Sequence, residues 1–173
     1  MPFEAYKRAA LATNFAGMKN PFSIIRLVFK ATRPSRLQDM KAVKDAFWMK
    51  PNYAAMTFFG FIVTATQREA DKVNEHYDSL KNHEMIHLRQ AEDCHDSWLL
   101  FYIRYGWYYL RALPYNRKKR NAAYWMNPFE LEAYEHEHDL DYLKHRPAGG
   151  EEWRKYARMT PKQRFEKLFL RQK

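Results

Sequence analysis

Residues 82–90 read Asn-His-Glu-Met-Ile-His-Leu-Arg-Gln, and the interpretation of the whole chain starts from this stretch. His83 and His87 are four residues apart, so in a helix both imidazoles share one face and can reach a single metal ion. Glu84 lies about 100° around such a helix from His83. In the HExxH spacing this glutamate does not bind the metal but takes a proton from the water opposite the ligands. The stretch predicts a metal-binding helix with Glu84 as a general base.

The sequence around this stretch favours a helix over residues 78–95. Asp78 or Ser79 is a suitable N-cap, and no helix breaker follows before Cys94. Two histidines at this spacing also occur on ordinary helix faces, where they are solvated or structural, so that alternative stays open. His76 and His95 flank the helix and receive no role.

Two sources can supply a third ligand, because a catalytic zinc takes three protein ligands and leaves one position for water. Asp93 stands at the last position of the extended pattern HExxHxxGxxH/D, but Gln90 replaces the glycine that would turn the chain back. The second source is a later helix that begins at Asn127-Pro128, a good N-cap and first position, and is predicted to run to about Lys144. Glu130 in that helix is the expected ligand.

Other roles for the acidic residues of this later helix remain open. As the third residue after an N-cap, Glu130 could instead close a capping box on the Asn127 backbone. Glu132 is then the reserve ligand, and Glu135 is the third choice. His136 and His138 diverge by about 200° on a helix and cannot both face one site.

The pairing of NHExxHLRQ at 82–90 with FExEAY at 129–134 resembles the glutamate-type zincin metallopeptidases, and more closely a group of small bacterial zincin-like proteins. The resemblance covers about residues 55–145. It implies a Zn²⁺ cofactor held by His83, His87 and Glu130, and hydrolysis of peptide bonds in a peptide or protein substrate. Tyr134 stands where the family often has an aspartate that orients a histidine. Glu132, Glu135 and Asp141 are the candidates to replace that aspartate.

Residues 55–66 are rich in aromatic and β-branched residues, which predicts one strand with a bulge or close approach at Gly60. As a sheet edge beside the cleft, this strand could hold an extended peptide by backbone hydrogen bonds. Tyr134 and Tyr124 are candidates to stabilise an oxyanion, with His136 or His138 as an alternative.

Three further helices are expected. Ser35-Arg36-Leu37-Gln38 is a candidate capping box for a helix that stops at Pro51, and Thr160-Pro161 opens the last helix. Residues 98–113 form a helix that is apolar nearly all round, which indicates burial in the core, with membrane contact as the alternative.

Composition and charge exclude several classes. The 173 residues are 46 % apolar, which excludes global disorder, and the single cysteine, Cys94, excludes a disulfide framework or a multi-cysteine zinc module. The N-terminus lacks a secretory signal pattern, so a cytoplasmic location is expected, with a peripheral position at the membrane as an option. The net charge is +10, and residues 1–50 and 153–173 are basic whereas 51–152 are slightly acidic.

The sequence therefore predicts one α+β domain, mostly helical, with a zincin-like core at 51–146 and basic helical extensions at 1–50 and 147–173. The expected function is that of a zinc metallopeptidase. The alternative is a non-catalytic or degenerate zinc module whose basic ends bind an anionic partner, either nucleic acid or a membrane surface. Basic composition alone gives no strong nucleic-acid signal, and the oligomeric state is left open.

Overall fold

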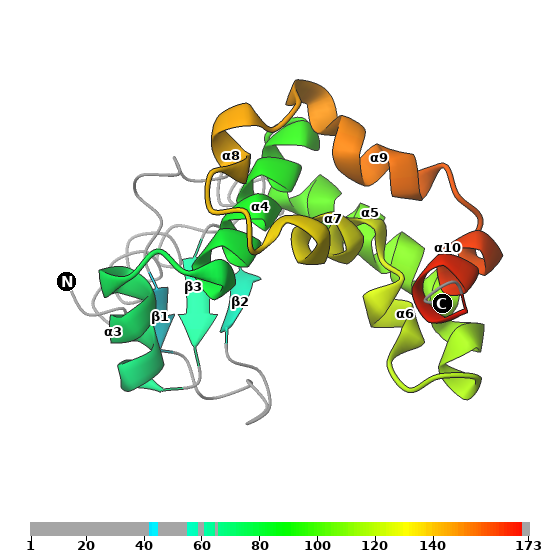
Figure 1. Ribbon diagram of the computed structural model, residues 1–173, viewed down its shortest axis with the longest axis horizontal. Helices are drawn as coiled ribbons and strands as arrows, with labels where there is room; N and C mark the ends of the chain where they lie inside the picture. The colour runs from blue at the N-terminus through cyan, green and yellow to red at the C-terminus, as the bar shows by residue number, and fades with distance from the viewer. Residues whose placement is uncertain (1–41, 45–54, 59–60, 65, 171–173) are drawn as a thin grey trace, which may run out of the picture.

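The computed structural model describes residues 42–44, 55–58, 61–64 and 66–170 (Figure 1). This part of the chain is mostly helical with one small sheet, which confirms the predicted α+β class. Helix α4 (Ser79–Asp93) crosses the centre of the molecule, with the sheet on one side and the later helices on the other.

The sheet contains β1 (Ala42–Lys44), β2 (Ala55–Phe58) and β3 (Phe61–Thr64) in the order β1-β3-β2. β1 is parallel to β3, and β2 is antiparallel to it with Phe58 opposite Phe61. The prediction of one strand over 55–66 is therefore wrong, because the run doubles back and pairs its two halves. Gly60 lies in the connection, outside the described residues.

The prediction of a helix between Ser35 and Pro51 is also wrong for residues 42–44, the part of this range that the structure describes. Residues 42–44 are strand β1, paired with β3 from Ala42 opposite Ile62 to Lys44 opposite Thr64. The rest of that prediction lies outside the described residues. Pairing with a distant strand decides the backbone of 42–44, against a local pattern that favoured a helix.

Two helices follow the sheet directly. α3 (Gln67–Glu75), which the sequence reading missed, begins with a capping box between Thr66 and Glu69 and packs against β1 and β3. α4 begins at the predicted cap, where the Asp78 carboxylate accepts a hydrogen bond from the Lys81 amide. Its side chains from Asn82 to Leu88 are all buried, because the helix lies between β2 and the later helices.

Helix α5 (Trp98–Ala112) confirms the predicted helix but not its burial. Trp98, Phe101 and Ala112 are buried, whereas Ile103 and Trp107 are 58 % exposed. The inner face packs on the main core, and no other described element covers the opposite face. Within the described ranges, no helix is long and apolar enough to cross a membrane.

The chain then forms a second, smaller core around the end of α5. The elements that build it are η2 (Leu113–Arg117), α6 (Ala122–Trp125) and α10 (Pro161–Phe169). The predicted start of the last helix is confirmed, because Thr160 caps α10 in a capping box with Gln163. These elements form the lobe on the right of Figure 1.

Helix α7 (Pro128–His136) starts at the predicted Asn127 cap but ends eight residues earlier than expected. A separate short helix, α8 (Tyr142–His145), follows. The amide of the buried Asn82 on α4 donates hydrogen bonds to the backbone carbonyls of His136, Glu137 and Asp139, at 2.9–3.0 Å. This contact between distant parts of the chain ends the helix and turns the backbone.

The chain returns through η3 (Ala148–Gly150) to α9 (Glu151–Ala157), which packs along α7. Gly150 has φ of 73°, and a Cβ there would lie 2.3 Å from Nε1 of Trp153. Trp153 in turn packs on Phe129 of α7, with ring centroids 4.7 Å apart. The return segment thus holds α7 against α4, and these two helices carry the site.

Candidate metal centre

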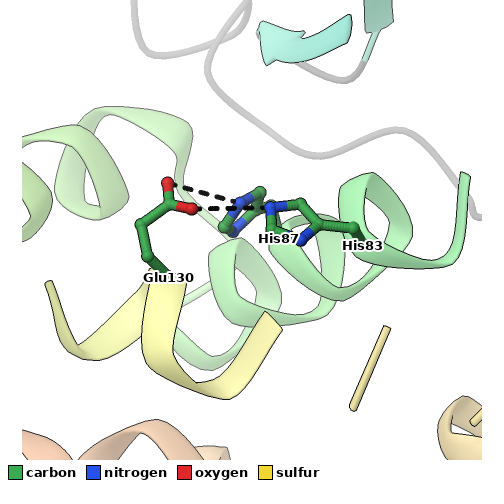
Figure 2. A group of neighbouring side chains, drawn as sticks. All are labelled: His83, His87 and Glu130. Carbon is green, nitrogen blue, oxygen red and sulfur yellow. Dashed lines mark ion pairs between the residues drawn. The ribbon is translucent and has the colours of Figure 1, made fainter. Parts of the chain in front are cut away.

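Three buried side chains from two helices converge on one point (Figure 2). His83 and His87 project from adjacent turns of α4, and Glu130 projects from the first turn of α7. Glu130 Oε2 lies 3.4 Å from His83 Nε2, and Glu130 Oε1 lies 3.6 Å from His87 Nε2. All three ligand atoms lie within 4.8 Å of one another.

These separations suit one small divalent ion. Ligand bonds of about 2.0–2.2 Å in a tetrahedron place neighbouring ligand atoms roughly 3.3–3.6 Å apart. Glu130 Oε2 is buried and makes no hydrogen bond, which leaves a carboxylate oxygen that a cation can satisfy. The described residues therefore bring together a donor set that fits a metal ion.

Glu130 is held towards the histidines and away from its own helix terminus. The Asn127 side chain caps α7 by accepting from the Phe129 amide, and the Tyr105 hydroxyl donates to Glu130 Oε1 at 2.8 Å. Burial raises the pKa of Glu130, but His87, His83 and Tyr105 outweigh it, so the pKa lies below its ordinary value. Of the two readings of Glu130, ligand or cap, the geometry fits the ligand.

The partner of His83 on its far side is Glu137, just beyond the end of α7. Glu137 Oε2 lies 3.0 Å from His83 Nδ1. Because a carboxylate accepts, Nδ1 carries a proton, so Nε2 is the nitrogen at which a metal would bind after displacing its proton. Burial lowers the pKa of His83, but Glu130, Glu84 and Glu137 outweigh it and raise the pKa to about 9.

The partner of His87 is Gln90, one turn further along α4. Gln90 Oε1 lies 2.8 Å from His87 Nδ1. The Gln90 amide group donates to the Phe129 carbonyl at 3.0 Å and to Glu132 Oε2 at 2.9 Å, which fixes the orientation of the amide. Its oxygen must then accept from His87, so this histidine also presents Nε2 to the metal position.

Glu132 supports the centre from behind and takes no ligand position. It is fully buried and accepts from the Tyr142 hydroxyl at 2.9 Å and from Arg146 Nε at 2.6 Å. Arg146 also donates to Asp93 Oδ2 at 2.6 Å. Asp93, the candidate from the extended pattern, is therefore held in this buried ion network and contributes nothing to the three-ligand cluster.

Tyr134 and Tyr124 lie side by side next to His83. The Tyr134 ring meets the His83 ring at 4.5 Å between centroids, and the two tyrosine hydroxyls are 3.0 Å apart. Burial is the largest cause that raises the pKa of Tyr134 to about 12, and it also raises the pKa of Tyr124. Both hydroxyls stay protonated at neutral pH and can donate hydrogen bonds.

Glu84 and the metal ligands face a common cavity of about 160 Å³. Glu84 is buried, and the Thr57 hydroxyl lies 2.6 Å from Glu84 Oε2. Most of the other lining residues are apolar or aromatic. The residues that complete the lining are Ala55, Met56, Phe101, Tyr102, Tyr105 and Tyr124.

Strand β2 forms one wall of this cavity and is an edge strand of the described sheet. Thr57 also anchors the wall to α5, because its carbonyl accepts from the Tyr102 hydroxyl at 3.0 Å. β3, the other half of the predicted strand, is paired on both sides. The edge-strand hypothesis can therefore concern β2 alone.

Several contributors escaped the sequence reading. Glu137 lies seven residues after Glu130, two helical turns on, and that spacing was a usable signal. For Gln90, the sequence pattern indicates only that it replaces the glycine of the extended HExxH pattern, not that it orients His87. Nothing in the sequence singled out Tyr105 or Thr57, because both act through tertiary contacts.

Other acidic or histidine candidates lie away from the three-ligand cluster. Glu135 faces Lys155 at 3.4 Å, and Asp141 pairs with Lys144. His136 stacks on Tyr142 with centroids 3.9 Å apart, and His138 is largely exposed. The structure therefore offers none of them as a ligand or as a replacement for the aspartate of the zincin pattern.

No protein-family model matches the chain, and searches of curated proteins and of solved structures find no match. The candidate metal centre is therefore interpreted from its own residues. It comprises two imidazoles and one carboxylate, each oriented by a neighbouring polar side chain, beside a cavity that also contains Glu84.

Proposed function

We propose that this chain is a zinc-dependent metallopeptidase with a zincin-like core over residues 51–146. The observation that carries the proposal is the placement of Glu84 in the same cavity as the ligand set His83, His87 and Glu130. A metal site with only a structural role needs no buried carboxylate beside its ligands and no adjoining cavity. Catalytic zinc sites commonly have two histidines and one glutamate with a position left for water.

Zinc is the proposed metal because two imidazoles and one carboxylate in a compact, buried set match its preferred ligands. Bound there, zinc would lower the pKa of a water molecule to about 7 and polarise a substrate carbonyl. Glu137 and Gln90 hold the two imidazoles in the tautomer that such binding needs.

Glu84 is the proposed general base. Its carboxylate accepts the proton from the attacking water and later passes it to the leaving amine. The Thr57 hydroxyl holds Oε2 in place, so the other oxygen is the one available for this proton. Tyr124, which lines the cavity, is the proposed donor to the developing oxyanion, and Tyr134 holds the Tyr124 hydroxyl in turn.

The proposed substrate is an extended peptide that pairs with the edge of β2. Ala55, Met56 and Thr57 bring this edge to the cavity, so backbone pairing would place the scissile bond near Glu84. The aromatic and aliphatic lining favours an apolar side chain next to that bond. Short flexible segments of a protein or peptide suit this small cavity.

Hydrolysis of fluorescent casein and of a quenched peptide library, with and without zinc, tests this proposal. Glu84→Gln removes the base but keeps the size of the side chain, so activity should fall on the order of 100-fold or more. Zinc binding should be retained, and Glu135→Gln on the exposed side of α7 is the matched control. Activity that survives Glu84→Gln would show that the base is another residue. A wild-type chain that binds zinc and hydrolyses no substrate would favour the non-catalytic zinc module.

A further inference from the structure

The outer face of α5, defined here as Ile103, Trp107 and Leu110, is a strip of exposed apolar side chains. These residues are 58 %, 58 % and 61 % exposed. At about 100° per residue they fall within an arc of about 60° on the helix. Leu113, 39 % exposed, follows at the end of the strip. Adjoining exposed apolar side chains of this kind often mark a contact surface.

The stretch of chain that carries this strip has charge of one sign. Residues 98–129 contain no aspartate or glutamate, although they contain six arginines and lysines. Arg111 lies on one flank of the strip, over the Trp107 ring at 5.7 Å, whereas the Nη1 atom of Arg104 is buried. The other four cations are the basic run 117–120, which is exposed and begins at Arg117, the last residue of η2.

The charges of Arg111 and the basic run 117–120 are not offset within the described part of the chain. Among the ion pairs formed by the described residues, none involves Arg111 or the basic run 117–120. Lys118 instead lies over the Tyr115 ring at 5.3 Å. The surface thus combines an apolar strip with unneutralised positive charge in one continuous part of the chain.

We propose that the outer face of α5 and the basic run 117–120 dock on the surface of an anionic lipid bilayer. The strip would enter the boundary between headgroups and acyl chains, and the basic run would contact lipid phosphates. Trp107 and the arginines suit this boundary, because each has an apolar body and a polar end. The helix lies on the membrane in this arrangement and does not cross it.

Other occupants match this surface less well. Nucleic acid would match the cations but would leave Ile103 and Leu110 without an apolar partner. A second copy, related by a two-fold axis, would place the same unneutralised arginines against each other. An anionic bilayer satisfies both the apolar strip and the charge.

The opposite face of the same helix lines the cavity of the candidate metal centre through Phe101 and Tyr105, and Tyr102 lines the cavity from the side of the helix. Docking through the outer face would therefore hold the cavity at a fixed orientation to the lipid surface. This consequence does not depend on peptidase activity, and the surface can be tested in a chain that hydrolyses nothing.

Co-sedimentation with vesicles tests the proposal. The full chain should bind vesicles of phosphatidylcholine with added phosphatidylglycerol, bind phosphatidylcholine alone weakly, and lose affinity steeply as salt rises. Combining Ile103→Ser, Trp107→Ser and Leu110→Ser should lower the affinity at least about tenfold. Converting the four cations of the basic run 117–120 to Gln should also lower it, by about fivefold per residue.

Matched controls distinguish binding through this surface from nonspecific adsorption to vesicles. Leu140→Ser removes another exposed apolar side chain, and Lys144→Gln with Lys162→Gln removes cations that already have carboxylate partners. Neither control should change vesicle binding. Quenching of tryptophan fluorescence by brominated lipids should be strong in the wild type and largely lost in Trp107→Phe, which tests the contact even where a triple variant folds poorly.

Three outcomes would overturn the proposal. The first is no binding to anionic vesicles at low salt. The second is unchanged vesicle binding after removal of the apolar strip, which would make the surface a general polyanion site, such as one for nucleic acid. The third is a wild-type chain that does not bind vesicles and instead forms a dimer in solution, with the dimer lost when the strip is substituted.

Discussion

At the scale of single residues, each histidine of the metal centre is held by a different polar partner. Glu137 orients His83 at 3.0 Å, and Gln90 orients His87 at 2.8 Å. The carboxylate comes from beyond the end of another helix, whereas the amide comes from the next turn of the same helix. Both partners leave Nε2 free, so both act on metal affinity through the tautomer and the angle of the ring.

Gln90→Leu should lower zinc affinity by about 10–100-fold, the usual range for loss of a partner that orients a ligand. The substitution leaves His87 Nδ1 buried without an acceptor and removes the donor to Glu132 and Phe129. Competition with a chelator of known affinity measures the change. Equal zinc affinity in Gln90→Leu and wild type would contradict the role of Gln90.

At the scale of elements, the site depends on how α4 meets α7 and on where α7 stops. The Asn82 side-chain amide donates to three backbone carbonyls at the end of α7, and its side-chain oxygen Oδ1 accepts from the Tyr77 hydroxyl at 2.8 Å. The helix end that Asn82 fixes is also the segment that presents Glu137 to His83. One asparagine beside the first ligand thus couples helix termination to the metal centre.

Asn82→Ala should therefore reduce both stability and zinc affinity. Several carbonyls lose their donor in a buried position, which costs about 1–3 kcal/mol for each group left unsatisfied. Urea unfolding and chelator competition measure the two effects. Asn116→Ala is the control, because Asn116 accepts from the Ala123 amide in the second core and makes no contact with the three-ligand cluster among the hydrogen bonds of the described residues. Loss of stability without loss of zinc affinity in Asn82→Ala would contradict the coupling.

A buried ion network joins α4, α7 and the segment after α8. Arg146 lies between Glu132 and Asp93, and the three side chains are 5 %, 0 % and 8 % exposed. Removal of the cation would leave two buried carboxylates without compensation.

Arg146→Met should lower the free energy of unfolding by about 3–5 kcal/mol. Arg158→Met is the matched control, because its ion pair with Glu151 is largely exposed and should contribute no more than about 0.5 kcal/mol. Urea denaturation of the two variants and the wild type makes the comparison. Similar losses in both variants would contradict the assignment of Arg146 to a buried network.

Features that depend on neighbours in the sequence could be predicted, whereas features that depend on distant partners could not. Asp78, Asn127 and Thr160 cap helices through neighbouring amides, so those starts were predictable from local sequence. Distant partners decide that α7 ends at His136 and that residues 42–44 form a strand. The predictions of a helix that runs to about Lys144 and of a helix over 42–44 were therefore wrong. The convergence of His83, His87 and Glu130 was predictable because HExxH is local and Glu130 follows a recognisable cap. Tyr105 and Thr57 had no local signal.

At the scale of the whole molecule, α5 separates two different surfaces. Its inner face lines the cavity beside the metal ligands, and its outer face is exposed and apolar. The expectation of all-round burial failed because a helix of this composition was treated as a core element. Whether other elements cover a helix depends on the complete fold, so it cannot be predicted from the composition of that helix alone.

The metal centre is the claim on which the account of function rests. Zinc content per chain by plasma mass spectrometry tests it most directly, on wild type, Glu84→Gln and Glu130→Ala purified side by side. Wild type and Glu84→Gln should each contain about one zinc, because Glu84 is not a ligand. Glu130→Ala should contain little or none. A full zinc in Glu130→Ala, or none in wild type after zinc is supplied, would contradict the three-ligand site.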